Sequence, residues 1–472
     1  MNLEPSLDPG LASSSPKRPP TWYVGRRTQQ VLFTLSGALW IAIGGNSALA
    51  QGEEARPVET ISQYGITWTL DRPAVAGRYV TGDWWVVGPV TVLEVAPTSA
   101  PGRHGSVVNP PAGTIQGYDD RMAGYDAKLR ADFPLELKPG QSLVSVASLD
   151  KVGDRTPDTV PRQYARGPLR TAVVLTCVAA PPEADAFRPA YVGDWRESFR
   201  VSQLRRDRLP RLPPPGGELP GLAGLDRMLE RIWLDHQREW GNRAMHPLEN
   251  MPDYGRDITN VVADTALRLM LDDPDGRYET LLLRFVQKGI DYYGAAQSNA
   301  DLWVANGGHN SGRKLPILFA GILLDHEGMM QVKATFQEDQ QTYYGPGFRG
   351  QKALWRITLG NPNTRHEEVD PATWETFGKD SNNGLKAEGY RKLNGPTWVG
   401  QALVMRLMGA KELWNHPPFF DYVDRWCAEE GDKAAFGLAK AMWESYRAKA
   451  DEIGAALRRK RTSEPRTGKV LP

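Results

Sequence analysis

The sequence predicts an α+β protein of two domains, in which a β-sandwich-like domain precedes a domain of helical pairs. Three observations point to this class. The chain of 472 residues is too long for one ordinary hydrophobic core. Short apolar segments separated by turn residues fill the region 51–205. From residue 222 onward, apolar residues instead recur at the 3.6-residue spacing of helices.

Strand-like segments punctuated by turn residues characterise region 51–205. Apolar runs lie at 66–70, 84–93, 142–147 and 171–176. Gly, Pro, Asn and Asp fill the gaps between them, and no helical period of useful length occurs. A β-sandwich or a similar sheet domain is the economical arrangement for such a region.

A proline-rich segment, residues 206–221, is predicted to link this domain to the helices, because proline stiffens the chain and glycine ends the stiff stretch. The helical domain is predicted to span 222–457 and to be followed by a disordered basic tail, 458–472. Its first helix carries Leu225, Met228 and Ile232 at helical spacing. Further helices are expected near 278–293, 315–325, 397–408 and 433–447.

The N-terminus has the pattern of an export signal. Arg26 and Arg27 precede an apolar run, 31–43, which is short for a membrane span. Small residues follow, with a cleavage site of the A-x-A kind at Ala50–Gln51. We therefore predict that residues 1–50 form a signal peptide with a disordered lead-in. The mature protein is expected in the periplasm or outside the cell, with no membrane attachment after cleavage.

Charge and cysteine content exclude several classes of function. The formal net charge is +1, so nucleic acid is not an expected partner. Cys177 and Cys427 lie far apart in sequence, and two separately buried thiols are expected rather than a disulfide. His366 and the two glutamates after it lack the second histidine of zinc proteases. Phosphate-cradling loops and nucleophile elbows are absent from the sequence, so we expect no cofactor and no metal.

The segment 303–316 concentrates the most chemistry in the chain. Gly307 and Gly308 permit positive φ or a close approach to a ligand, and His309 follows this bend. Amides, cations and an indole surround it, and an apolar helix begins directly afterwards. The start of a helix favours an anionic ligand because its N–H groups are unpaired. The candidate residues are Trp303, Asn306, His309, Asn310 and Arg313. A histidine that only orders the turn is the structural alternative.

Other polar loops also precede helices in this domain. Helical pairs packed in a ring would bring the starts of the inner helices to one cleft, where these loops would meet His309. The side chains that we expect there are tyrosines and arginines: Tyr254, Arg256, Tyr343, Tyr344, Arg349, Tyr390 and Arg391. Packing or surface turns are the structural alternatives for the same residues.

These residue types suit β-elimination at a uronate of an acidic polysaccharide. The reaction needs a neutralised carboxylate, a base that removes the C5 proton and an acid that protonates the leaving oxygen. Asn, His and Arg stabilise the enolate-like charge, and Tyr or His transfers protons. A phenol among cations is expected to have a lowered pKa.

The helical region resembles the alginate and glucuronan lyases with (α/α) toroid folds. An Asn/Gly/His loop before an inner helix and a later Tyr-Arg pair carry the resemblance over about residues 222–455. It implies an (α/α) toroid-like catalytic domain in which His309, with Asn306 or Asn310, holds the uronate carboxylate. It also implies that one tyrosine transfers protons beside an arginine. The candidate pairs come from Tyr343, Tyr344, Tyr390, Arg349 and Arg391.

The Gly-Gly pair before the histidine departs from the lyase pattern. In the N-terminal region, the segment 82–90 resembles uncharacterised secreted bacterial proteins. Two other functions remain open. A glycoside hydrolase on the same scaffold needs two carboxylates that flank the bond. The other is a non-catalytic carbohydrate-binding envelope protein. Candidates for the two carboxylates are Asp257, Asp301, Glu375, Asp380 and Glu388.

Overall fold

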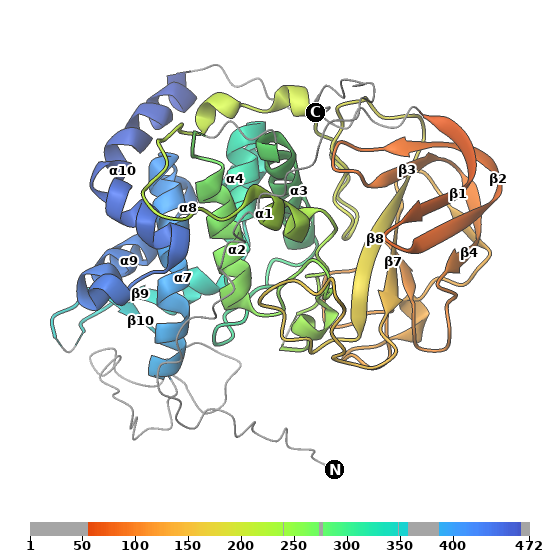
Figure 1. The fold of residues 1–472 in the computed structure, drawn as a ribbon, viewed down its shortest axis with the longest axis horizontal. Coiled ribbons are helices and arrows are strands. Elements are labelled where there is room, and N and C mark those ends of the chain that lie inside the picture. Colours follow the sequence, from red (N-terminus) through yellow and green to blue (C-terminus); the bar gives the residue numbers. More distant parts are fainter. Residues whose placement is uncertain (1–54, 239, 273–276, 348, 357–386, 464–472) are drawn as a thin grey trace, which may run out of the picture. The chain divides into compact units, whose positions relative to one another are not determined.

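In a computed structural model of the protein, a strand-rich half of the chain precedes a helical half (Figure 1). The structure describes residues 55–238, 240–272, 277–347, 349–356 and 387–463. The described residues all belong to one compact unit. The mixed α+β class is therefore confirmed. The predicted signal peptide lies outside the described residues.

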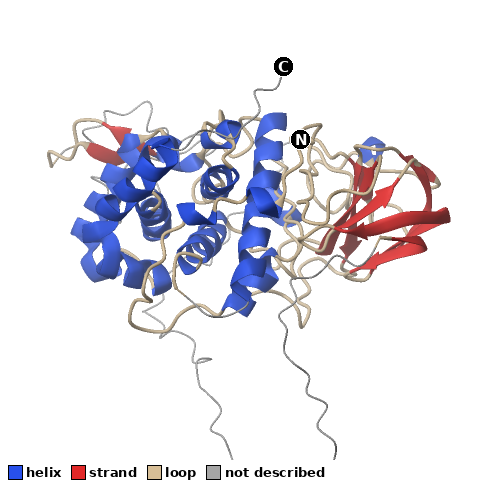
Figure 2. Ribbon diagram, turned by 90° about the horizontal axis from the view of Figure 1, so that it is seen from above, coloured by secondary structure: helices blue, strands red, loops and turns tan. Residues whose placement is uncertain are grey.

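The strands of the N-terminal half form one curled sheet (Figure 2). Their order is β5-β7-β8-β3-β2-β4-β6, and β1 pairs with β2. All neighbouring strands are antiparallel except β3 and β8, which run parallel. The strands are β1 (Arg56–Gln63), β2 (Ile66–Arg78), β3 (Trp84–Val87), β4 (Val90–Ala96), β5 (Ser106–Val108), β6 (Leu135–Leu137), β7 (Ser142–Ser148) and β8 (Leu169–Val178). One continuous sheet replaces the predicted β-sandwich.

Alternation along β7 and β8 explains why a single curled sheet suffices. Leu143 and Leu175 point into an apolar cluster inside the curl, which also contains Trp68. Val144 and Val174 point to the opposite face and join the core of the helices. Because side chains alternate across a strand, both faces of these central strands are buried. The outer face of this sheet is therefore covered by irregular segments and helices of the same apolar cluster, and not by a second sheet within the described residues.

The helical half consists of long helices joined by short ones and by irregular segments. The helix α4 is buried along its whole length, and it packs against α3 and α5. The helix α7 packs against α2, α9 and α10. The helices are α1 (Leu222–Leu229), α2 (Gly255–Arg268), α3 (Arg277–Ser298), α4 (Lys314–Leu324), α5 (Glu327–Met330), α6 (Gln337–Gln341), α7 (Ala387–Leu407), α8 (Lys411–Trp414), α9 (Pro417–Glu430) and α10 (Gly437–Ser463).

Two segments differ from the sequence-based expectations. The segment 342–350, predicted as a loop, begins a two-stranded ribbon of β9 (Thr342–Tyr344) and β10 (Ala353–Trp355). Residues 458–463, predicted as part of a disordered tail, form the end of α10. There Arg461 donates to the carbonyl oxygens of Met408 and Gly409, which anchors the helix end.

A buried arginine connects the two halves of the chain. The guanidinium of Arg188 donates to Asp83 at 2.9 Å and to Asp291 of α3 at 2.7 and 2.9 Å. All three side chains are buried. Cys177 and Cys427 are both free thiols, as expected, but Cys427 is half-buried rather than buried. Among the described helices, none combines the length and apolar character needed to cross a membrane.

Candidate functional site

The bend before α4 brings the backbone of the candidate loop against α2 and α7. Gly307 has φ +56°, and a Cβ added there would lie 2.6 Å from the ring of Tyr390. A Cβ added at Gly308 would lie 2.3 Å from a methyl carbon of Leu393. Glycine is therefore needed at both positions because α7 packs directly on the backbone.

Three buried amide side chains hold this bend in place. Oε1 of Gln337 accepts from the backbone N–H groups of Asn306 and Asn310, at 3.1 and 2.9 Å. Nε2 of Gln341 and Nδ2 of Asn394 both donate to the carbonyl oxygen of Gly307, at 2.7 and 2.9 Å. Satisfied backbone groups of this kind fix the loop in one conformation.

Two of the predicted site residues have buried side chains that contact other residues of the protein. The amide of Asn310 donates to the carbonyl oxygen of Val304 at 2.7 Å, and its side chain is buried. Trp303 is also fully buried, where its ring stacks on Phe336 and meets the edge of Tyr292. Both residues support the loop from within.

The cations at the start of α4 are also paired inside the protein. Arg313 is fully buried and binds Asp235 through two nitrogens, at 2.7 and 3.1 Å. Although burial opposes it, Arg313 and His246 hold the pKa of Asp235 below its usual range. Lys314 binds Asp339 and the carbonyl oxygen of Trp414. The charges of Arg313 and Lys314 therefore stabilise the fold. Because Asp235 already neutralises Arg313, another cation would have to bind an anionic ligand at this site.

The imidazole of His309 is buried and has both ring nitrogens without a hydrogen-bonding partner among the described residues. Its ring lies 5.1 Å from that of Trp240 and 6.2 Å from that of Tyr254, between centroids. Burial lowers the pKa of His309 well below its usual value, and the charges of Arg313 and His246 lower it further. The ring is therefore neutral at pH 7. Buried polar atoms of this kind usually have a partner, so a ligand is the natural candidate.

The tyrosine beside His309 is Tyr254. Its hydroxyl oxygen lies 3.1 Å from the position that a Cβ on Gly308 would take. Burial raises the pKa of the Tyr254 phenol, and this outweighs the opposing charges of Arg256 and Arg243. Our expectation of a lowered phenol pKa is wrong for this residue, because desolvation disfavours the phenolate. The Tyr254 phenol therefore carries its proton at neutral pH.

The structure does not bring all of the predicted tyrosines together. Tyr390 packs against Gly307, close to the His309 loop. Tyr343 and Tyr344 lie on β9 and are exposed. The hydroxyl of Tyr344 donates to Asp421, and together with burial this raises its pKa to about 12.

The predicted arginines are also divided. Arg256 at the start of α2 binds Asp257 at 2.7 Å and the hydroxyl of Tyr164. Arg391 on α7 forms ion pairs with Glu429 and Glu430 of α9, at 3.9 and 3.5 Å. Arg349 is exposed in the turn of the β9–β10 ribbon. Of these three, only Arg256 is close to Tyr254, with its guanidinium 5.7 Å from the ring.

Two residues that the sequence did not indicate complete the cluster. Trp240 and Arg243 belong to a 3-10 helix, 240–245, which has no apolar period that would draw attention to it. The guanidinium of Arg243 lies 3.5 Å from the centroid of the Trp240 ring. Its Nη1 atom is buried without a hydrogen-bonding partner in the described chain. Burial and the charge of Arg166 lower the pKa of Arg243 to about 10, so this cation stays charged at pH 7.

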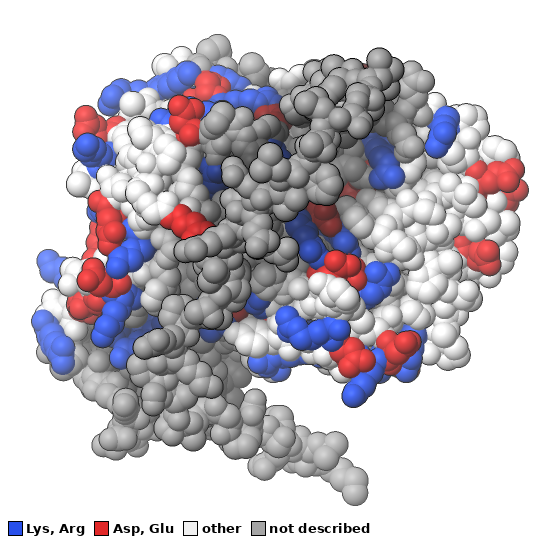
Figure 3. Space-filling view, viewed as in Figure 1, with Lys and Arg blue, Asp and Glu red and all other residues white. Residues whose placement is uncertain are grey.

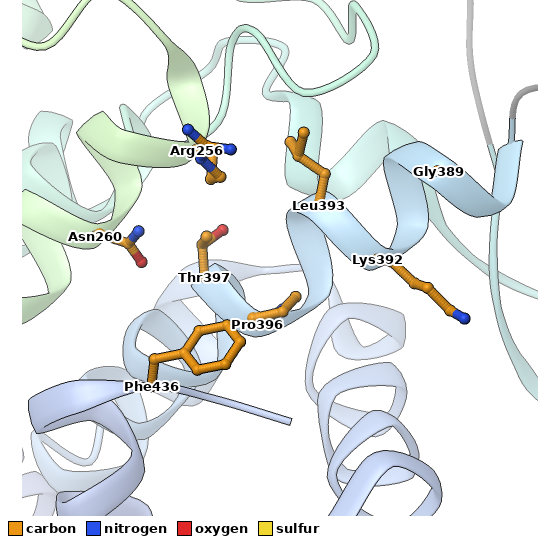
Figure 4. A pocket seen from close by; sticks show the side chains of 8 residues that line it. All are labelled: Arg256, Asn260, Gly389, Lys392, Leu393, Pro396, Thr397 and Phe436. Carbon is orange, nitrogen blue, oxygen red and sulfur yellow. The ribbon is translucent and has the colours of Figure 1, made fainter. Parts of the chain in front are cut away.

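A pocket of about 320 Å³ lies between α2, α7 and the start of α10 (Figure 4). Arg256, Asn260 and Thr397 form its polar part, and Pro396 and Phe436 lie together on its apolar side. Pro396 lies inside α7 and has no N–H for the helix, which locally loosens that wall. The pocket is also lined by Gly389, Lys392 and Leu393. Because Leu393 contacts Gly308 as well, the pocket adjoins the His309 loop.

The carboxylates needed by a hydrolase do not form a pair among the described side chains. Asp257 binds Arg256, whereas Asp301 accepts from Thr335 at 2.7 Å in an exposed turn. Glu375 and Asp380 lie outside the described residues, as does the side chain of Glu388. Within the described part of the chain, no group of His, Cys, Asp and Glu side chains is arranged to hold a metal ion.

Comparisons with models of protein families, with curated proteins and with solved structures found no match to this chain. The candidate site is therefore defined by its geometry and charge. Its central residues are His309, Tyr254, Trp240, Arg243 and Arg256.

Proposed function

We propose that this protein is a polysaccharide lyase that cleaves a uronate-containing polymer by β-elimination beside His309. The observation that carries the proposal is the imidazole of His309, which has two unpartnered nitrogens and a protonated phenol, Tyr254, next to it. Arg243 contributes a buried N–H group without a partner. A neutral base, a proton donor and a free cationic donor are the three groups that the reaction needs.

In the proposed reaction, the carboxylate of the sugar is held by Arg243. A carboxylate bound here raises the pKa of His309 again, because opposite charge favours the imidazolium. The imidazole then takes the C5 proton, and the electrons of the C5–H bond form the C4–C5 double bond as the C4–O bond breaks. The leaving oxygen takes the proton of Tyr254. Transfer of a proton from His309 back to the phenolate restores the starting state.

Access to the imidazole is part of the proposal. His309 is fully buried, and its neighbour Trp240 is 42% exposed. A sugar therefore reaches the imidazole when the Trp240 side chain moves. Such rearrangements of a covering side chain commonly exclude water from the reaction.

The finer points of fold and location belong to the same proposal. The helical pairs α3–α4 and α2–α7 pack closely, which supports an (α/α) toroid as the scaffold. The sequence pattern of residues 1–50 supports export to the periplasm or the medium. Secretion would place the enzyme where acidic polymers occur.

The test is incubation of the purified protein with alginate, glucuronan and glycosaminoglycans, followed by the absorbance of the unsaturated product. We expect absorbance to rise on at least one uronate polymer and to stay flat on a neutral glucan. Reducing ends without unsaturation would instead identify a hydrolase, and binding without any product would identify a carbohydrate-binding protein. Either result would overturn the lyase proposal.

A further inference from the structure

The loop between β7 and β8 reaches the candidate site from the sheet half of the chain. Val160 donates its backbone N–H to the carbonyl oxygen of Leu248 at 3.0 Å. The side chain of Gln163 is buried and donates to the carbonyl oxygen of Met251 at 2.6 Å. The backbone N–H of Tyr164 donates to Asp253 at 3.3 Å. The loop is thereby fixed on the segment that leads into α2.

The backbone of this loop is strained around Tyr164. Arg162, two residues before it, and Ala165, directly after it, have φ of +65° and +54°. Non-glycine residues in the left-handed region cost on the order of 1 kcal/mol each, and they cluster at functional sites. The Oε1 atom of Gln163 accepts from the N–H of Ala165 at 3.0 Å, which holds the strained backbone in place.

The strained loop presents an aromatic ring among arginines. Tyr164 is 45% exposed, and its ring lies 6.5 Å from that of Tyr254. The guanidinium groups of Arg166 and Arg256 lie 5.2 and 5.8 Å from the Tyr164 ring. Trp240 lies 6.1 Å from the ring of Tyr254, in an edge-to-face arrangement. Aromatic rings in edge-to-face contact, with cations beside them, thus connect the β7–β8 loop to His309.

We propose that Tyr164, Arg166 and Arg256 form a subsite for an anionic sugar unit next to the unit that is cleaved. The Tyr164 ring supports the apolar face of the sugar, and the two arginines bind its carboxylate or sulfate. This inference rests on the proposed function and extends it, because it assigns the sheet half a role in substrate choice. The preference for anions is expected to come from these two arginines and not from the overall surface charge. On the face of the molecule shown in Figure 3, basic and acidic side chains are intermixed.

The alternative for these arginines is a purely structural role. Arg166 forms an ion pair with the buried Asp253 at 3.5 Å, and Arg256 forms one with Asp257 at 2.7 Å. Each guanidinium has five N–H donors in a planar fork, and one carboxylate uses two of them at most. The side chain of Arg166 is 40% exposed and its contact with Asp253 is made through Nε, which leaves its terminal nitrogens for a ligand.

The test uses full-length protein with Tyr164→Ala, Tyr164→Phe and Arg166→Gln. Trp443→Ala and Arg447→Gln serve as matched controls, because Arg447 lies 5.5 Å from the Trp443 ring on α10. Calorimetry measures the binding of hexamers of mannuronate, glucuronate and heparin, and of maltohexaose. These measurements use a Tyr254→Phe background, in which cleavage of the substrate is slowed. Thermal unfolding checks that each variant is folded.

We expect Tyr164→Ala and Arg166→Gln to weaken binding of an anionic hexamer about tenfold, the loss of one charged or stacking contact. Tyr164→Phe keeps the ring and is expected to retain most of the binding, as are both controls. Maltohexaose should bind weakly and equally to all variants. In the active protein, KM for the polymer should rise with little change in kcat.

The outcomes separate this subsite from the proposed reaction. Unchanged affinity and KM in Tyr164→Ala and Arg166→Gln, with product still formed, overturn the subsite and leave the lyase proposal intact. Weakened binding by these variants, in a protein that forms no unsaturated product, supports the subsite although the lyase proposal fails. A wild-type protein that binds none of the anionic hexamers overturns the subsite as well.

Discussion

The rings of Tyr254 and His309 lie 6.2 Å apart between centroids and are inclined by 52°. Tyr254 precedes α2 and His309 precedes α4, so two helix starts supply the two groups. Burial acts on both in the direction of the neutral form, because it raises the pKa of Tyr254 and lowers that of His309. The pair therefore combines a protonated acid with an unprotonated base at pH 7.

A series of tyrosine variants tests which phenol moves the proton. We expect Tyr254→Phe to lower kcat by about 100-fold or more, the usual contribution of general acid catalysis. Tyr390→Phe should cost much less, because Tyr390 packs on the backbone of Gly307 and the proposed reaction assigns its proton donor to Tyr254. Tyr344→Phe loses only the bond to Asp421 and should keep nearly full activity. Rates of formation of the unsaturated product decide the order, and a larger loss in Tyr344→Phe than in Tyr254→Phe would contradict this assignment.

The ion pair beneath the loop can be tested through stability. Arg313→Met leaves the buried carboxylate of Asp235 without its main counter-charge. Breaking such a buried pair usually costs about 3–5 kcal/mol. Arg458→Ala is the control, because its ion pair with Glu412 is exposed and such pairs contribute at most about 1 kcal/mol. Urea denaturation gives both free energies of unfolding. Equal losses in the two variants would show that Arg313 is not essential to the fold.

Local patterns in the sequence predicted the strands and helices better than they predicted the contacts between them. The apolar run of β7 and the apolar helix after Lys314 were predictable, because each pattern lies within one element. A sandwich and a curled sheet can both contain such a strand, so the run does not determine whether Val144 faces another sheet or the helical half. The pairing of Arg313 with Asp235, 78 residues earlier, has no local signature at all.

For the candidate site too, the sequence indicated individual residues but not how the helices bring them together. The bend at Gly307 and the histidine after it were visible in the sequence, and so was Tyr254 as one of several tyrosines. Sequence spacing could not select Tyr254, since the choice depends on how α2 packs beside α4. Trp240 and Arg243 lie in a short 3-10 helix, and helices of this length leave no periodic signal.

Close packing of the loop on α7 predicts opposite effects for two glycine substitutions. Gly308→Ala would place a Cβ 2.3 Å from Leu393 and 3.0 Å from Oδ1 of Asn394. Such overpacking usually costs about 1–3 kcal/mol. Gly224→Ala in α1 meets nothing within 4 Å and should stabilise the protein by roughly 0.5–1 kcal/mol, since alanine favours helix. Thermal unfolding measures both. A neutral Gly308→Ala would mean that α7 moves easily and that the loop is less tightly held.

The buried amine of Lys288 predicts how stability depends on pH. Burial lowers its pKa to about 7, and Arg188 and Arg284 act in the same direction against Asp291 and Asp83. The Nζ atom donates to the carbonyl oxygen of Arg231.

Between about pH 7 and the unperturbed pKa of 10.5, the unfolded chain holds a proton on this amine that the folded chain has released. The unfolded state thus binds more protons, and this group makes the free energy of unfolding rise with pH across that interval. Below pH 7 both states are protonated, and the full cost of burying the charge remains. Lys288→Met removes this contribution, so its stability should rise less steeply than that of the wild type from pH 7 to pH 9.

The comparison is made by urea denaturation at several pH values, with Lys440→Met as the control. Lys440 is partly exposed and pairs with Asp432 and Glu444 on the surface. The pH profile of Lys440→Met should run parallel to that of the wild type, because Lys440 lies at the surface and its ion pairs are exposed. Parallel profiles for Lys288→Met and the wild type would mean that Lys288 stays protonated in the folded protein, held by Asp291 and Asp83.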